Sequence, residues 1–310
     1  MRLVHLPAIR NKYTETLSHT LLSAVHAATR RYDIVYVCNS ANAPICFIPW
    51  LRRQRTILNV DGLEWRRQKW GRVARSYYRW AARLAARMPI EVVTDARVIQ
   101  DYYARVLHRQ TPCFVYGTET YSRGHLGERV RALGLEPDGY VLYVSRMERE
   151  NNALLVVQGY RHVGTDLPLV MVGDAPYAPD YVREVKAAAD ERVRFLGFRF
   201  GDDYHALQAN ARLYVQATEV GGTHPALVEA MGHGNAIVAH DVPEHHEVLD
   251  DAGVYFARQS AEDLGQIITG LLSDDRKIAD LRERAERRVV DRYGWGAVTE
   301  QYERYFRELT

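Results

Sequence analysis

The stretch that decides the fold runs from residue 219 to residue 234 and reads EVGGTHPALVEAMGHG. It follows the apolar run 213–217, which predicts a buried strand, and Pro225 suits the first turn of a helix, where a missing N–H costs nothing. A glycine pair between a strand and a helix leaves backbone N–H groups open to an anion, which the helix N-terminus also favours. Glu229 follows about one turn later, where it is placed to accept hydrogen bonds from sugar hydroxyls. The pattern predicts an α/β unit that holds a sugar nucleotide; an ordinary helix cap with a surface glutamate is the alternative.

The composition is that of a globular protein large enough for two domains. The chain has 310 residues, of which 47% are hydrophobic and 26% charged, as in ordinary globular domains. A formal net charge of +2 gives no reason to expect nucleic acid as a partner. The three cysteines, Cys38, Cys46 and Cys113, fit neither a disulfide framework nor a zinc site, so a reducing cytoplasm is predicted. No apolar run approaches the ~20 residues that span a bilayer, so any membrane contact is expected to be peripheral, on the inner face.

Short apolar runs alternate with amphipathic stretches along the whole chain, which is typical of parallel α/β units. The expected strands are 3–6, 33–38, 55–60, 91–94, 113–116, 140–144, 169–172, 193–196, 213–216, 236–239 and 253–256. The polar stretch 124–139 is the best candidate for a linker. We predict a Rossmann-like domain over residues 1–130, a second one over 131–290, and a helix over 291–310 that returns to the first. The first 61 residues contain no glycine, so the Gly-rich turn that normally opens such a domain is missing and the first domain is expected to be incomplete.

Four segments make the chain resemble the retaining glycosyltransferases of the GT-B architecture (family 4-like), and within them a bacterial rhamnosyltransferase-like subfamily that builds cell-surface polysaccharide. They are residues 7–13 with the helix after them, 59–70, 144–152 and 221–231. The resemblance implies two Rossmann-like domains facing a cleft, with the acceptor on the first and a nucleotide-sugar donor on the second. It also implies transfer of a sugar, in the narrowest reading rhamnose from dTDP-rhamnose, to a saccharide or polyprenyl-linked acceptor, without a metal or other cofactor. The alternatives are an inactive shortened transferase that binds nucleotide or a partner and, ranked last, a sugar-nucleotide epimerase.

The chain departs from the superfamily at three places of the site. Of two glutamates that flank seven residues at the donor turn, Glu229 keeps one place, Gly221 takes the other, and Glu219 lies two residues further out. An Arg and Lys pair on the pyrophosphate becomes Arg146 with Asn151, and Asn151 cannot neutralise a phosphate. A His-Asp pair after the third strand of the first domain becomes Asp61 followed by glycine.

The candidate catalytic residues are Asp61, Arg146 and Glu150. Arg146 is expected to clamp the donor phosphates and stabilise the leaving nucleoside diphosphate; a salt bridge to Glu148 or Glu150 is the alternative. Asp61 is expected to orient or deprotonate the acceptor hydroxyl or to contact the donor sugar, against a plain Asp-Gly turn. The candidate donor-binding residues are Ser145, Asn151, Gly173, Asp174, Gly197, Phe198, Gly221, Gly222, Thr223, His224, Leu227 and Glu229.

The segment 65–88 carries eight Lys or Arg residues and no acidic residue. Its apolar residues recur at helical spacing: Trp70, Val73, Tyr77, Trp80 and Leu84. An ordinary helix with a solvated basic face explains the pattern; attraction to an anionic membrane or to a polyprenyl-pyrophosphate acceptor is the alternative. None of the twelve histidines has metal-ligand spacing, so no metal is predicted.

Overall fold

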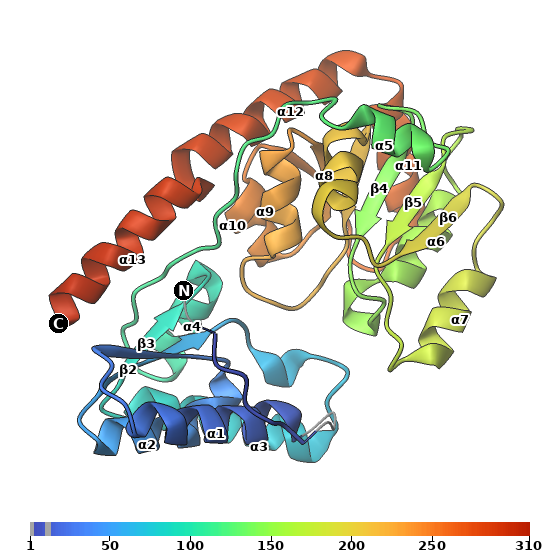
Figure 1. The fold of residues 1–310 in the computed structure, drawn as a ribbon. Coiled ribbons are helices and arrows are strands. Elements are labelled where there is room, and N and C mark those ends of the chain that lie inside the picture. The colour runs from blue at the N-terminus through green and yellow to red at the C-terminus, as the bar shows by residue number, and fades with distance from the viewer. Residues whose placement is uncertain (1–2, 10–13) are drawn as a thin grey trace. The chain divides into compact units, whose positions relative to one another are not determined.

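The computed structural model describes residues 3–9 and 14–310, so residues 10–13 of the first resemblance segment lie outside the described part. The chain divides into two compact units (Figure 1). Unit 1 comprises Met1–Val115 and Thr299–Thr310, and unit 2 comprises Tyr116–Val298. Each unit is built around its own parallel sheet.

Unit 1 contains a three-stranded parallel sheet in the order β1-β2-β3. Its strands are β1 (Ile34–Cys38), β2 (Arg55–Val60) and β3 (Glu91–Thr94), and its helices are α1 (Glu15–Ala28), α2 (Phe47–Leu51), α3 (Arg72–Arg87) and α4 (Arg97–Val106), with 3₁₀ turns η1 (Ser40–Cys46) and η2 (Glu64–Arg66). The strand expected at 3–6 is wrong: these residues pair with no strand, and Leu3 and Val4 are exposed. The strand expected at 113–116 is reduced to a single bridge between Cys113 and Thr94.

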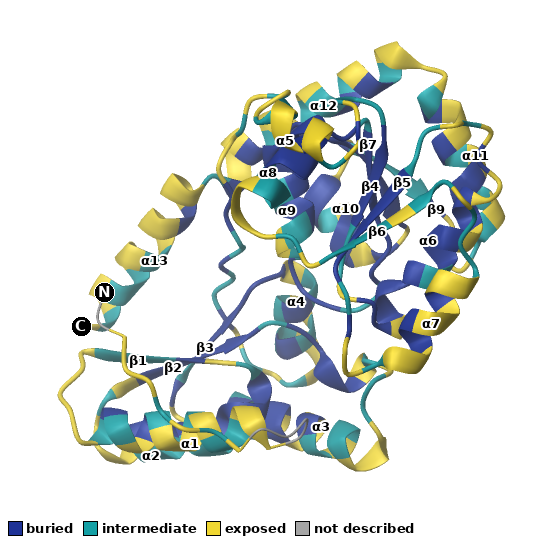
Figure 2. Cartoon of the chain, turned by 45° about the vertical axis from the view of Figure 1, so that its right-hand side comes forward, coloured by how far each residue is buried: buried dark blue, intermediate teal, exposed yellow. Residues whose placement is uncertain are grey.

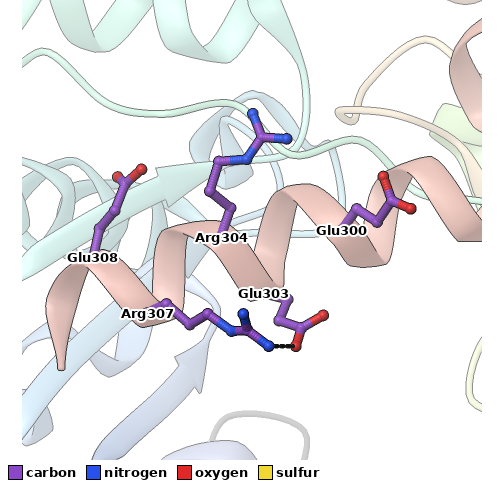
Figure 3. A pocket seen from close by; sticks show the side chains of 5 residues that line it. All are labelled: Glu300, Glu303, Arg304, Arg307 and Glu308. Atoms are coloured by element: carbon purple, nitrogen blue, oxygen red, sulfur yellow. Dashed lines mark hydrogen bonds and ion pairs between the residues drawn. The ribbon is translucent and has the colours of Figure 1, made fainter.

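The helix α13 (Trp295–Leu309) supplies the last part of unit 1. Its residues Tyr302, Tyr305 and Phe306 pack against Ile57, Val93 and Phe114, and the ring centroids of Phe114 and Tyr302 are 4.5 Å apart. The charged residues of α13 line a surface pocket, shown in Figure 3: Glu300, Glu303, Arg304, Arg307 and Glu308. The helix is therefore amphipathic, with an aromatic side that completes the core of unit 1.

Unit 2 contains a six-stranded parallel sheet in the order β6-β5-β4-β7-β8-β9. The strands are β4 (Val141–Val144), β5 (Leu169–Val172), β6 (Val193–Gly197), β7 (Leu213–Gln216), β8 (Ala236–His240) and β9 (Gly253–Phe256). The helices are α5 (Gly127–Ala132), α6 (Ala153–Tyr160), α7 (Pro179–Ala187), α8 (Gly201–Asn210), α9 (Pro225–Gly232), α10 (Pro243–Leu249), α11 (Ala261–Leu272) and α12 (Asp275–Arg288). The central strands are buried along nearly their whole length (Figure 2), as expected when helices cover both faces of a parallel sheet.

This strand order is that of a Rossmann fold, in which the chain first builds outward from the centre and then returns to build in the other direction. The order reverses between β4 and β7, which are direct neighbours. In such sheets ligands bind at the carboxyl ends of the strands beside this reversal. The fold therefore points to the loops after β4 and β7.

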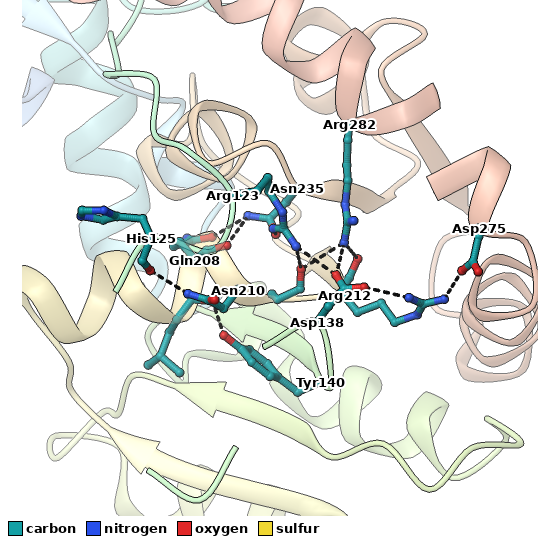
Figure 4. A network of polar contacts seen from close by, with 12 residues as sticks. Arg123, His125, Asp138, Tyr140, Gln208, Asn210, Arg212, Asn235, Asp275 and Arg282 are labelled. Carbon is teal, nitrogen blue, oxygen red and sulfur yellow. Dashed lines mark hydrogen bonds and ion pairs between the residues drawn. The ribbon is translucent and has the colours of Figure 1, made fainter. Parts of the chain in front are cut away.

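The segment after Val115 belongs to unit 2, so the units divide earlier along the chain than the expected boundary at residue 130. The Thr118 N–H donates to the Tyr293 carbonyl (2.7 Å), and the Tyr121 N–H donates to the Gly232 carbonyl (2.8 Å). The stretch 124–139 contains α5 and is no linker. Asp138, near its end, lies among three arginines, Arg123, Arg212 and Arg282 (Figure 4).

Candidate functional site

Most of the predicted site residues lie at one edge of the unit 2 sheet. Ser145, Gly173 and Gly197 lie at or just after the carboxyl ends of β4, β5 and β6, and the turn 221–224 connects β7 to α9. These ends meet at one edge because all six strands are parallel. The structure thus gathers four loops that are far apart in the sequence.

The loops after β4 and β7 are hydrogen-bonded to each other. The Glu219 N–H donates to the Glu150 carbonyl (2.9 Å). The Asn152 side-chain amide donates to the Ala217 carbonyl (2.9 Å) and to a Glu219 carboxylate oxygen (3.1 Å). Asn152 also adopts a positive φ of 59°, which asparagine tolerates better than most residues. These bonds fix the spacing of the two loops on either side of the strand-order reversal.

Arg146 is held at one side and open at the other. Its guanidinium lies 3.5 Å from a carboxylate oxygen of Glu148, and its side chain is 52% exposed. The Tyr177 hydroxyl donates to the same Glu148 oxygen (2.6 Å), and burial together with this hydrogen bond raises the pKa of Tyr177 to about 12. The expected alternative, a salt bridge to Glu148, is therefore present, and it leaves half of the side chain open to solvent.

Asn151 is buried and serves the backbone of its own loop. Its side-chain amide donates to the Arg146 carbonyl (2.7 Å), and its own carbonyl accepts from the Tyr143 hydroxyl (2.6 Å). These neutral hydrogen bonds shape the turn between Arg146 and α6. Asn151, at the place where the resemblance implies a lysine, therefore supports the loop in this chain.

Gly173 permits a close backbone approach between the loops after β4 and β5. Its φ is +119°, and a Cβ at this position would overlap the Ser145 carbonyl oxygen. Its N–H donates to the Gly197 carbonyl (2.8 Å), while the Asp174 carboxylate accepts from the Ala175 N–H (2.7 Å). Phe198 is exposed and stacks on Phe200.

The turn before α9 is buried, and the helix begins at Pro225. Gly221 lies against the imidazole of His224, where a Cβ would overlap the ring, and His224 makes an edge contact with His245 (5.3 Å between centroids). Burial, with His224 and His240 nearby, holds the pKa of His245 well below its usual value, so His245 is neutral. Leu227 is fully buried and Gly222 and Thr223 are also buried, so the Leu227 side chain belongs to the interior.

Glu229 is oriented by a tyrosine of α8. The Tyr204 hydroxyl donates to one Glu229 carboxylate oxygen and accepts from the Gln208 amide, which lies 3.1 Å away. Burial and the neighbouring carboxylate raise the pKa of Tyr204, which keeps it a hydrogen-bond donor. Nothing in the sequence signals this pair, because Tyr204 is 25 positions from Glu229.

Asp61 lies in unit 1, directly after β2. Burial and the nearby Glu64 raise its pKa, against the lowering effect of Arg67 and Lys69. Glu64 itself accepts from Arg67 (2.6 Å) and from the Trp70 indole N–H (3.2 Å). The carboxyl group of Asp61 therefore lies near charges of both signs, a setting frequent among proton-transferring groups.

Across the part of the chain that the structure describes, no cluster of three or more His, Cys, Asp or Glu side chains is arranged to hold a metal ion. Within the same residues, no helix has the length and apolar character needed to cross a membrane.

The sequence of unit 2 matches a known family. Residues 138–274 match the model described as "Glycosyl transferases group 1". This part of unit 2 is therefore similar in sequence to the group 1 glycosyltransferases. Residues 19–119, most of unit 1, match a model described only as a domain of unknown function, DUF1972.

Two curated relatives are similar to about half of this chain. The chain is 27% identical over 171 residues to O-antigen chain mannosyltransferase B of Escherichia coli, covering 53% of this chain and 44% of that protein. It is 30% identical over 187 residues to phosphatidyl-myo-inositol mannosyltransferase of Mycolicibacterium smegmatis, covering 56% and 47%. The chain thus matches less than half the length of these relatives.

Solved structures share the fold of nearly the whole chain. HepE of Anabaena, solved with UDP and glucose, superposes with a TM-score of 0.82 at 18% identity, covering 94% of this chain and 82% of that one. Sucrose-phosphate synthase of Thermosynechococcus elongatus gives 0.79 at 17% identity, covering 95% and 78%. The expected fold class, α/β with two Rossmann-like parallel-sheet domains of the GT-B type, is confirmed.

Proposed function

We propose that this protein is a glycosyltransferase that binds a nucleotide-sugar donor on unit 2 and transfers the sugar to a saccharide or polyprenyl-linked acceptor in cell-surface glycan synthesis. The observation that carries the proposal is the hydrogen-bonded pair of loops at the strand-order reversal, in a domain similar in sequence to the group 1 glycosyltransferases. These loops bring a half-exposed arginine and the start of α9 to one edge of the sheet. Both features favour an anionic ligand.

In this proposal Arg146 and the N–H groups of the turn 221–223 hold the donor diphosphate, and the leaving nucleoside diphosphate gains their stabilisation as its charge develops. Glu229, oriented by Tyr204, accepts hydrogen bonds from the ribose. Asp61 acts on the acceptor hydroxyl, since its raised pKa makes it a better proton acceptor once ionised. No metal or other cofactor takes part in the proposed reaction.

The narrower proposal is a retaining transfer of rhamnose from dTDP-rhamnose. Its support is the resemblance of the four segments to the rhamnosyltransferase-like subfamily. The curated relatives carry other names: two are mannosyltransferases, and a third, from Campylobacter jejuni, is named for transferring N-acetylgalactosamine to a diphospho-undecaprenol acceptor. The donor sugar and the stereochemistry therefore need a direct assay.

A peripheral contact with an anionic membrane is part of the proposal. The helix α3 carries five arginines and no acidic residue, while Val73 is 86% exposed and Trp80 50% exposed on the same helix. Exposed apolar residues among basic ones favour the interface of an anionic bilayer. Binding to phosphatidylglycerol vesicles and not to phosphatidylcholine vesicles would support this contact.

The deciding experiment measures nucleotide binding and sugar transfer with the full chain. Calorimetry with UDP, GDP and dTDP should show binding of at least one diphosphate, and Arg146→Gln should weaken it by about tenfold to a hundredfold, as expected for the loss of one charge-assisted hydrogen bond. Arg149→Gln is the matched control, because Arg149 is similarly exposed but pairs with Glu184 (3.0 Å). That variant should bind as the unmodified protein does.

Transfer is then assayed with the corresponding nucleotide sugars, dTDP-rhamnose included, and the anomeric configuration of the product is read by NMR. Failure of every nucleotide to bind would overturn the proposal. Binding without transfer to any lipid-linked or saccharide acceptor would leave the protein as a nucleotide-binding one.

A further inference from the structure

Unit 1 contains a cavity that the proposed donor site does not use. It has a volume of about 580 Å³ and lies between the start of α3, the start of α1 and the turn η1. Its walls include Leu17, Ala41, Trp70, Val73, Tyr77 and Tyr78. The volume falls within the ~300–1,000 Å³ typical of small-molecule sites.

The walls of this cavity are mainly apolar, and the polar atoms of Tyr77 and Trp70 are already hydrogen-bonded. The Tyr77 hydroxyl donates to the Ala41 carbonyl (2.8 Å). The indole N–H of Trp70 donates to Glu64 (3.2 Å), and the Trp70 and Tyr78 rings lie 5.3 Å apart. What remains toward the cavity is mainly ring faces and aliphatic carbon, which suits a hydrocarbon chain better than a sugar or a nucleotide.

The charges around the cavity indicate which kind of lipid would supply the hydrocarbon tail. Arg72 lines the cavity, and the flanking segment 65–88 has eight basic residues and no acidic one. An amphiphile whose head group is anionic would place its charge among these residues and its tail among the aromatic rings. The most exposed apolar side chain of α3, Val73, also belongs to the cavity wall, so the wall continues onto the surface of unit 1.

The cavity wall is joined to the segment that carries Asp61. Trp70, which forms part of the wall, donates its indole N–H to Glu64 (3.2 Å), three residues after Asp61. A tail in the cavity would place the head of its lipid beside this segment.

We propose that this cavity takes the hydrocarbon chain of an anionic polyprenyl lipid, the acceptor carrier of the reaction. Only the role of this lipid as the acceptor rests on the proposed function. The cavity, its aromatic lining and the basic residues around it do not depend on that function. The hydrocarbon tail anchors the acceptor in unit 1, and the arginines around the cavity bind the phosphate of the lipid.

Filling the cavity tests the proposal. Gly71 lines it, and a Cβ there would meet no atom within 4 Å, so Gly71→Leu adds a side chain without backbone strain. The matched control is Gly164→Leu, at an exposed glycine of unit 2 whose Cβ would also meet open space. Circular dichroism and the binding of nucleoside diphosphate establish that both variants are folded.

The probe is a polyprenyl phosphate with a photoreactive group near the end of its chain, presented in detergent micelles to the full protein. Crosslinks are expected within residues 16–17 and 70–78, and Gly71→Leu should reduce them at least tenfold while Gly164→Leu leaves them unchanged. Inorganic phosphate in excess should not compete with the polyprenyl phosphate, because the hydrocarbon tail provides most of the affinity. Phosphatidylglycerol vesicles should bind both variants alike, since Trp80 and the later arginines of α3 do not line the cavity.

Equal crosslinking of Gly71→Leu and the unmodified protein, or crosslinks confined to other parts of the chain, would overturn the inference. Competition by phosphate alone would do the same, because it would assign the binding to the head group. A protein that binds the polyprenyl phosphate in this way but binds no nucleotide would retain the cavity and lose the proposed transferase function.

Discussion

Replacing Gly173 with alanine is expected to displace the loop that carries Arg146. The backbone at Gly173 has a φ of +119°, and an added Cβ would lie 2.8 Å from the Ser145 carbonyl carbon and overlap its oxygen. Both atoms belong to the backbone, so no side-chain rotation can relieve the contact. Ser145 must move, and Arg146 follows it directly.

The magnitude comes from two contributions. A non-glycine residue in a sparsely populated backbone region costs about 1–3 kcal/mol, and overpacking against a fixed neighbour costs about 1–3 kcal/mol more. We expect Gly173→Ala to lower the free energy of unfolding by about 2–6 kcal/mol and to weaken nucleoside diphosphate binding under conditions where the variant is still folded.

Gly201→Ala separates the two contributions. Gly201 also has a positive φ, +58°, but a Cβ there would meet no atom within 4 Å, so only the backbone cost of about 1–2 kcal/mol applies. Urea denaturation of both variants gives the stabilities, and calorimetry gives diphosphate binding. If Gly173→Ala is no less stable than Gly201→Ala and binds diphosphate as tightly, the close approach to Ser145 has no role in shaping the loop.

Two further outcomes are expected from groups outside the donor loops. Asp138→Asn removes the carboxylate shared by three arginines and should lower the free energy of unfolding by about 1–3 kcal/mol, whereas Asp202→Asn, which breaks a surface pair with Arg129, should cost less than about 1 kcal/mol; equal urea midpoints for the two variants would contradict this. Burial lowers the pKa of His233 to about 4, below its unfolded value. The contribution of the neutral side chain to stability is therefore complete above about pH 6.5, and the free energy of unfolding falls by up to about 3 kcal/mol as the pH falls toward 4. His233→Gln should reduce the dependence of unfolding free energy on pH between 6.5 and 4.5, and an unchanged slope would show that His233 does not contribute to it.

The sequence predicts the sheets well because their strands are short, apolar and bounded by turn residues. The strands at 55–60, 91–94, 169–172, 213–216 and 253–256 match the structure residue for residue. The run 3–6 has the same apolar character but no partner strand within the described residues, and local pattern does not report partners. Phe114 lies in the similar run 113–116 and packs against Tyr302 of α13, nearly two hundred positions later, which no local pattern could reveal.

The prediction that the polar stretch 124–139 is a linker is wrong for a related reason. Its composition is that of a linker, yet Asp138 is held by Arg212 and Arg282 from distant elements. Charged residues considered one at a time predict a solvent-exposed segment. Only the folded chain shows that these charges pair with one another. The same limitation hid Tyr204, whose hydrogen bond to Glu229 depends on the packing of α8 beside α9.

Asn151 shows how the loop after β4 keeps its shape without the lysine that the resemblance implies. The Asn151 side chain is almost fully buried, so a lysine here would place its ammonium group in the interior. Burying a charge is costly unless it is fully paired. Asn151 instead donates a neutral hydrogen bond to the Arg146 carbonyl, so the residue that could have supplied a second charge now fixes the position of the first. In the proposed complex the diphosphate would then be neutralised by Arg146 and the amide groups at the start of α9. Binding should consequently depend on loop geometry, set by Gly173 and Asn152, as strongly as on charge.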